Sequence, residues 1–210
     1  MTTTRQFLVA ALAAAGVLMI AGCGGRTDAA ATDPPGDQAQ GRAGSLLIQA
    51  DDLPDGWRDS NVDEGAFRTT ICGVDLEPVE PLAGSHVRFS QGPFGPFLEQ
   101  HVRVYADAGQ PAAVAADLAA AVESCGTYTA KGTRPDSPAE VVKVRPLTVS
   151  GLPAGSAAFR QTAQGGDRLT NDMVFVPRGD ALVAFVSYAV KGTPDAKVLD
   201  AALSALPNGD

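Results

Sequence analysis

Four stretches rich in apolar residues, each bounded by turn-forming sequence, lie in the C-terminal half of the chain and predict four β-strands. The stretches cover residues 141–149, 157–164, 169–176 and 181–190. The segments GLPAG, GG and PRGD separate them and carry the residues that turns favour. Because short turns join antiparallel strands, we expect the four strands to form an antiparallel meander.

Two further alternating stretches come earlier, at residues 86–91 and 97–106. The turn-forming sequence GPFGP lies between them, so they predict a β-hairpin. Their apolar residues lie two positions apart, as expected for strands that bury one face.

Two stretches have helical spacing instead. The Ala-rich residues 112–121 follow Pro111, a favoured first-turn residue, and their apolar stripe continues to Cys125 before Gly126 ends the helix. Residues 194–206 form a second amphipathic stretch at the C-terminus. The order of elements predicts an α+β fold, in which an antiparallel sheet of about six strands has two main helices packed on one face.

The segment LLIQADDLPDGW, residues 46–57, precedes the hairpin. We expect it to begin with a short helix or strand and to pack Trp57, the chain's one tryptophan, against the sheet. Trp57 as a platform for a ligand is the alternative interpretation.

The first 22 residues have the features of a targeting segment. Arg5 precedes an apolar run from Phe7 to Ile20, and this run of about 14 residues suits a signal peptide better than a transmembrane helix of about 20 residues. The string LMIAGC resembles the lipobox of bacterial lipoproteins, which implies that Cys23 receives a diacylglycerol and becomes the first residue after cleavage. An ordinary secretory signal, in which Cys23 has no special role, is the alternative.

Residues 24–43 contain no large apolar residue and are rich in Gly, Ala, Asp, Pro and Gln. Such a segment cannot bury enough apolar surface to fold, so it predicts a flexible tether. We therefore expect a signal peptide over 1–22, a lipidated cysteine and disordered tether over 23–43, and one globular domain over 44–210.

The chain of 210 residues is acidic, with a formal net charge of −8. Cleavage before Cys23 removes Arg5 and no acid, which leaves 15 basic and 24 acidic residues and a net charge of −9. This charge argues against nucleic-acid binding, which requires a basic face, and against electrostatic attachment to anionic lipids. Membrane contact is thus expected through the lipid anchor alone, on the outer side of the cell membrane.

Two cysteines, Cys72 and Cys125, remain beyond the lipidation site. In an exported protein an even pair of thiols usually forms a disulfide, so we expect these two to be bridged. A metal site is not expected, because two cysteines and two histidines scattered along the chain give too few ligands.

A family resemblance comes from residues 102–125, VRVYADAGQPAAVAADLAAAVESC, and from the LLIQADDLPDGW segment. These are similar to the extracellular sensor domain of mycobacterial PknH-type receptor kinases and of actinobacterial envelope lipoproteins that share it. The resemblance covers about residues 44–207. It implies an antiparallel sheet with flanking helices and a cleft for an unidentified ligand.

The first hairpin supplies the candidate site. If Val87 and Phe89 share a face with Val102 and Val104, the opposite face collects four potential cations that could hold an anion: His86, Arg88, His101 and Arg103. Imidazoles ordinarily titrate near pH 6.5, so such a site would bind anions better at lower pH. The alternative is a solvated face whose cations pair with Glu99 and other acids.

Sequence motifs predict neither catalytic residues nor a cofactor. No Gly-x-Ser-x-Gly elbow and no phosphate-binding glycine loop is present, and Arg178-Gly179-Asp180 is explained by turn chemistry. We therefore predict a non-enzymatic, membrane-anchored lipoprotein whose sensor-like domain binds a small ligand or an envelope protein. The alternatives are a carrier of apolar or lipid molecules, suggested by the Phe-rich loop Phe94 to Phe97, and an envelope enzyme.

Overall fold

The structure is a computed structural model that describes residues 35–60, 70–131, 138–165, 169–189 and 192–207. The predicted signal peptide, the proposed lipidation site Cys23 and the first part of the predicted tether lie outside the described residues. Within the described part of the chain, no helix has the length and apolar character needed to cross a membrane.

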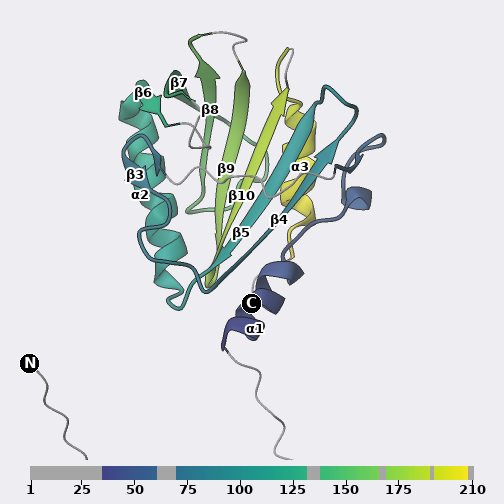
Figure 1. The fold of residues 1–210 in the computed structure, drawn as a ribbon, viewed down its shortest axis with the longest axis vertical. Coiled ribbons are helices and arrows are strands. Elements are labelled where there is room, and N and C mark those ends of the chain that lie inside the picture. The colour runs from purple at the N-terminus through teal and green to yellow at the C-terminus, as the bar shows by residue number, and fades with distance from the viewer. Residues whose placement is uncertain (1–34, 61–69, 132–137, 166–168, 190–191, 208–210) are drawn as a thin grey trace, which may run out of the picture. The chain divides into compact units, whose positions relative to one another are not determined.

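An eight-stranded antiparallel sheet forms the centre of the domain, in the strand order β1-β4-β5-β10-β9-β8-β7-β6 (Figure 1). The α+β prediction is confirmed, but the sheet is larger than expected. The additional strands β1 and β6 are only two and four residues long, too short to show a clear alternation. The bounds are β1 Arg58–Asp59, β4 Ala83–Ser90, β5 Phe97–Val104, β6 Thr127–Ala130, β7 Glu140–Pro146, β8 Ala157–Ala163, β9 Thr170–Arg178 and β10 Ala181–Ala189.

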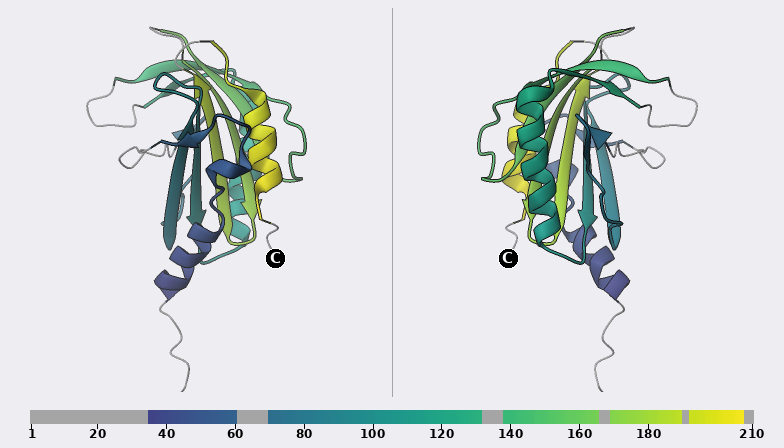
Figure 2. Two further views of the ribbon diagram at one scale, coloured as in Figure 1. Left: turned by 90° about the vertical axis from the view of Figure 1, so that its right-hand side faces the viewer. Right: turned by 90° about the vertical axis from the view of Figure 1, so that its left-hand side faces the viewer.

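Two predicted helices are present as α2 (Gly109–Cys125) and α3 (Ala196–Ala205). They cover opposite faces of the sheet, which corrects the expectation of a single covered face. Leu182 and Ala184 of β10 share a core with α2, whereas the intervening Val183 packs with α3. Figure 2 views the domain from two opposite sides: α3, in yellow, stands beside the strands in the left view, and α2, in teal, lies nearest to the viewer in the right view.

The signal for two covered faces lies in β10 itself. Its first five residues, ALVAF, form an unbroken apolar run, and all five are buried. A strand that faces water on one side alternates, whereas a strand buried on both sides is continuously apolar. This run therefore required a helix on each face.

A further helix, α1, occupies Pro35–Ser45, where the sequence predicted a flexible tether up to residue 43. Its Ala39 and Ala43 are buried in the core that also contains α3, and α1 belongs to the same compact unit as the sheet. Small alanines give little hydrophobic signal in a sequence, but they let a helix lie close to a sheet. Residues from Pro35 onward thus pack with the sheet, ahead of the domain start that the sequence predicted near Gly44.

Polar contacts also hold α1 in place. The side-chain nitrogen Nε2 of Gln40 donates to the Ser85 hydroxyl of β4 at 2.9 Å, and Arg42 Nε lies 3.3 Å from Asp180 Oδ1. Asp180 follows Gly179 in the two-residue turn between β9 and β10, where Gly179 has a φ of 60°. The Arg-Gly-Asp sequence thus forms a hairpin turn, as predicted.

The segment before the hairpin contributes a one-turn 3-10 helix, η1 (Ala50–Asp52), and the buried Trp57. Trp57 packs in the core beneath α1 and α3, which confirms its expected packing role. Nearby, the buried Gln100 side chain accepts a hydrogen bond from the Ile48 amide at 2.9 Å and donates to the Leu46 carbonyl at 2.8 Å. These two bonds fix the segment to β5.

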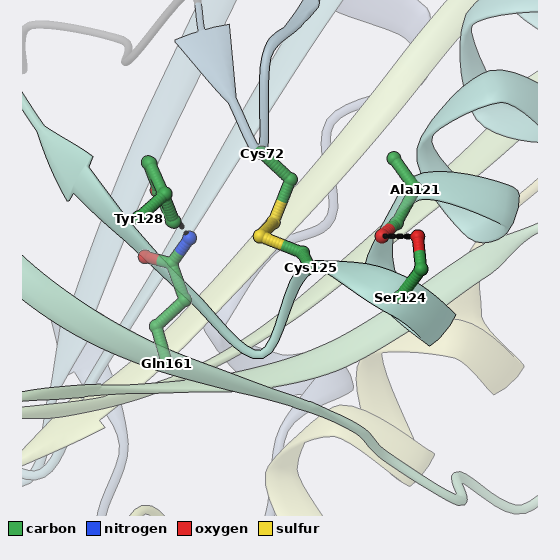
Figure 3. The surroundings of a disulfide bond; sticks show 6 residues. All are labelled: Cys72, Ala121, Ser124, Cys125, Tyr128 and Gln161. Carbon is green, nitrogen blue, oxygen red and sulfur yellow. Dashed lines mark hydrogen bonds between the residues drawn. A yellow bond between two sulfur atoms is a disulfide. The ribbon is translucent and has the colours of Figure 1, made fainter.

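The disulfide between Cys72 and Cys125 is present, with Cα atoms 5.8 Å apart (Figure 3). Cys72 lies in the turn of a small hairpin formed by β2 (Thr70–Ile71) and β3 (Val74–Asp75). Cys72 and Gly73 have φ values of 52° and 82°, and positive φ at both central positions characterises a type I′ turn. The bridge therefore ties this hairpin to the C-terminal end of α2.

Candidate functional site

The register of β4 and β5 brings the four predicted basic residues to one face of the sheet. His86 lies opposite His101, and Arg88 lies opposite Glu99. Arg103 is two residues from His101, so it points to the same side. We call this set the basic face: His86, Arg88, His101 and Arg103.

Glu99 lies at the centre of the basic face. One carboxylate oxygen, Oε1, accepts a hydrogen bond from the Tyr188 hydroxyl at 2.8 Å and lies 3.5 Å from Arg88 Nε. The other oxygen, Oε2, lies 3.4 Å from His101 Nε2. Glu99 thus occupies the position that a bound anion would take.

Arg103 has its own acidic partner. Its Nε donates to Glu77 Oε1 at 2.7 Å, and Glu77 lies in the segment between β3 and β4. Both arginines of the basic face therefore have a carboxylate partner. The alternative interpretation of this face expected such pairing with Glu99 and other acids. An external anion would have to compete with Glu99 and Glu77, and anion binding at this face stays a prediction.

Aromatic rings complete the cluster. The Arg88 guanidinium carbon lies 4.3 Å from the centroid of the Phe97 ring and 5.7 Å from that of Tyr188, within the range of cation-π contacts. Phe97 and Tyr188 stack on each other with centroids 5.0 Å apart. Of the Phe-rich loop, Phe97 is thus buried in the cluster, while Phe94 is 77% exposed.

The two histidines form a layered pair. Their rings stack with centroids 5.8 Å apart, and His101 is buried while His86 is exposed. The exposed His86 ring therefore stacks on the ring of the buried His101.

Opposing effects set the pKa of Glu99. Burial alone would raise the pKa, but hydrogen bonds from His101 and Tyr188 and the charges of His101 and Arg88 lower it below the ordinary value. The same contact acts on Tyr188, since burial and the Glu99 carboxylate raise the pKa of the Tyr188 hydroxyl. The network thus favours an ionised Glu99 beside a neutral Tyr188 hydroxyl.

Replacing Glu99 with Gln is expected to lower the free energy of unfolding at pH 7 by about 1.5–3 kcal/mol, the range for hydrogen bonds to a charged group. Because folding lowers the Glu99 pKa, its stabilisation is present above the unfolded-state pKa and is lost as pH falls through the folded-state pKa. Urea unfolding of both proteins at several pH values between about 3 and 7 measures this difference, which should shrink toward the acid end. Glu140→Gln, at an exposed position, is the control.

This chain resembles a known protein in its three-dimensional structure but not in its sequence. No protein-family model matches the chain, and no curated protein sequence does. The structure is similar to the crystal structure of the extracellular domain of PknH from Mycobacterium tuberculosis, with a TM-score of 0.56 and 13% sequence identity. The match covers 79% of this chain and 94% of that domain. At this identity the likeness shows a shared fold.

Proposed function

We propose that this protein is a non-enzymatic lipoprotein on the outer side of the cell membrane, whose sensor-like domain binds a ligand or an envelope partner. The observation that carries the proposal is the fold, which covers 94% of an extracellular domain. The Cys72–Cys125 disulfide supports an oxidising compartment. The signal peptide and the lipobox-like sequence before Cys23 supply the anchor.

Replacing Cys23 with Ala tests the anchor. The variant is expected to lack the lipid and either to leave the membrane or to accumulate as the uncut precursor. Detergent phase partitioning and the mass of the product distinguish these outcomes from the processed, lipidated wild type. A processed Cys23→Ala protein that still partitions fully with the detergent would contradict lipid anchoring.

A stability screen tests ligand binding. A compound that binds only the folded state raises the free energy of unfolding, by about 2.7 kcal/mol at a concentration 100 times its Kd. Fractions of an envelope extract are therefore added to the full-length lipidated protein in detergent, and the melting temperature is recorded. Mass spectrometry then identifies the stabilising compound. Chemical conversion of that compound by the protein would indicate an enzyme instead.

The basic face is the proposed contact for an acidic group of such a ligand. Arg88 is the residue to replace, because its side chain is 19% exposed and stacks on Phe97 rather than belonging to the apolar core. Arg88→Gln should reduce the shift in melting temperature caused by the identified ligand. An unchanged shift would place the ligand elsewhere on the domain.

A further inference from the structure

A second group of basic residues lies on β7 and β8, which are separated in the sheet from the strands of the basic face by β10 and β9. Lys143 and Arg145 belong to β7, and Arg160 belongs to the neighbouring β8. Arg145 lies directly opposite Arg160, and Lys143 is two residues from Arg145. All three therefore point to the same side of the sheet. We call Lys143, Arg145 and Arg160 the outer basic patch.

This side of β7 is open to solvent. Val142 and Val144 point to the opposite side, where they are buried in the core that contains α2. Lys143 and Arg145 are exposed, and the neighbouring Val141 is 50% exposed. A ligand can therefore reach the patch without displacing a helix.

Arg160 is fixed in the patch by Asp172 of β9. Its Nε and Nη2 donate to the two carboxylate oxygens of Asp172 at 2.5 and 2.6 Å. The hydrogen bonds from Arg160 to Asp172 raise the Arg160 pKa, so the guanidinium stays charged. Among the described residues, its remaining nitrogen Nη1 has no hydrogen-bond partner and is not buried.

The patch is electrostatically unbalanced in an otherwise acidic chain. Among the described residues, three cations face one carboxylate, that of Asp172, which leaves two positive charges. In the part of the chain that the structure describes, Lys143 and Arg145 form no ion pair. Like charges directly opposite each other on a sheet are unfavourable, so Arg145 and Arg160 gain from an anion placed between them. In the basic face, by contrast, both arginines already have acidic partners.

We propose that the outer basic patch binds a phosphate group, with Arg145 and Lys143 as the main charged contacts and Arg160 Nη1 as a fixed donor. Arginine suits this role because its planar guanidinium donates to two phosphate oxygens at once. The proposal extends the ligand-binding function proposed above to a different surface, and it does not depend on the lipid anchor. The phosphate could belong to a soluble molecule or to a lipid headgroup.

Calorimetric titration of the purified mature protein tests the proposal. Inorganic pyrophosphate is the probe for a soluble phosphate, and glycerophosphoglycerol, the deacylated headgroup of phosphatidylglycerol, is the probe for a lipid. Replacing both Lys143 and Arg145 with Gln should weaken binding at least about tenfold, because two charge-assisted contacts are lost. Since both side chains are exposed and Arg145 lies opposite Arg160, the melting temperature without ligand should not fall.

The matched control removes the same charge elsewhere. Arg58 of β1, at the opposite edge of the sheet, and Lys197 of α3 are both exposed, and their double Gln variant should bind within about twofold of the wild type. Tighter binding of pyrophosphate assigns the patch to soluble phosphates, and tighter binding of glycerophosphoglycerol assigns it to lipid headgroups. Absence of saturable binding to either probe, or equal weakening in both double variants, overturns the proposal. Such a result would not contradict the ligand-binding function proposed above, which the stability screen tests separately.

Discussion

Loss of the Cys72–Cys125 disulfide should lower the free energy of unfolding by about 4 kcal/mol, the chain-entropy estimate for a loop of this size. The bridge joins residues 53 positions apart. The hairpin that holds Cys72 has strands of only two residues each, so few backbone hydrogen bonds keep it in place. Its other attachment is apolar: Ile71 and Leu76 are fully buried in the core with α2.

Urea unfolding of the oxidised protein and of the double variant Cys72→Ser, Cys125→Ser measures this contribution. The double variant treated with a reductant is the control, because it has no bridge to lose and its midpoint should not move. Unfolding curves that coincide for the oxidised protein and the double variant would show that the buried Ile71 and Leu76 hold the hairpin without help.

Replacing Arg160 with Gln should lower the free energy of unfolding by about 3–5 kcal/mol, the range for removing one partner of a buried ion pair. The Asp172 side chain is only 1% exposed, and Arg160 donates to both of its carboxylate oxygens. Without the guanidinium, a charge would remain in the sheet interior with neither water nor a counter-ion. Thermal and urea unfolding both report this loss.

A double variant distinguishes the contribution of the Arg160–Asp172 ion pair to stability from the contributions of the residues around it. Replacing Asp172 with Asn as well as Arg160 with Gln removes both charges, so part of the stability should return. Arg145→Gln, directly opposite on β7 and exposed, should change the free energy of unfolding by less than about 0.5 kcal/mol. A double variant less stable than Arg160→Gln alone would show that Asp172 is needed for another contact.

The sequence predicts the long strands of this fold well, because they are rich in apolar residues and their turns are marked by glycine and proline. Residues 181–190, for example, were expected as a strand, and β10 is Ala181–Ala189. The hairpin β2–β3 was not expected, since its strands are too short for alternation to be recognised. Helix α1 was missed because its buried residues are alanines in a segment with the composition of a linker.

The candidate site was predictable only within one hairpin. Alternation placed His86, Arg88, His101 and Arg103 on one face, and the register of β4 and β5 agrees, because burying Phe89 and Val102 on the other face leaves little freedom. Tyr188 and Glu77 could not be assigned to the site from the sequence. Tyr188 comes from β10, which pairs with β5 although 76 residues separate the end of β5 from the start of β10. Periodicity within a strand does not reveal which distant strand lies beside it.

The position of β10 also determines when this domain can complete its fold. β10 lies between β5 and β9 and contributes to the cores on both faces, yet it is followed in the chain only by α3 among the described elements. Until residues 181–189 are available to fold, the edges of β5 and β9 that face β10 have no partner. Unpaired edges promote aggregation, and contacts between distant parts of a chain form slowly. The nascent domain is therefore most exposed to aggregation just before its C-terminal residues are made, and a truncation that removes β10 opens both cores at once.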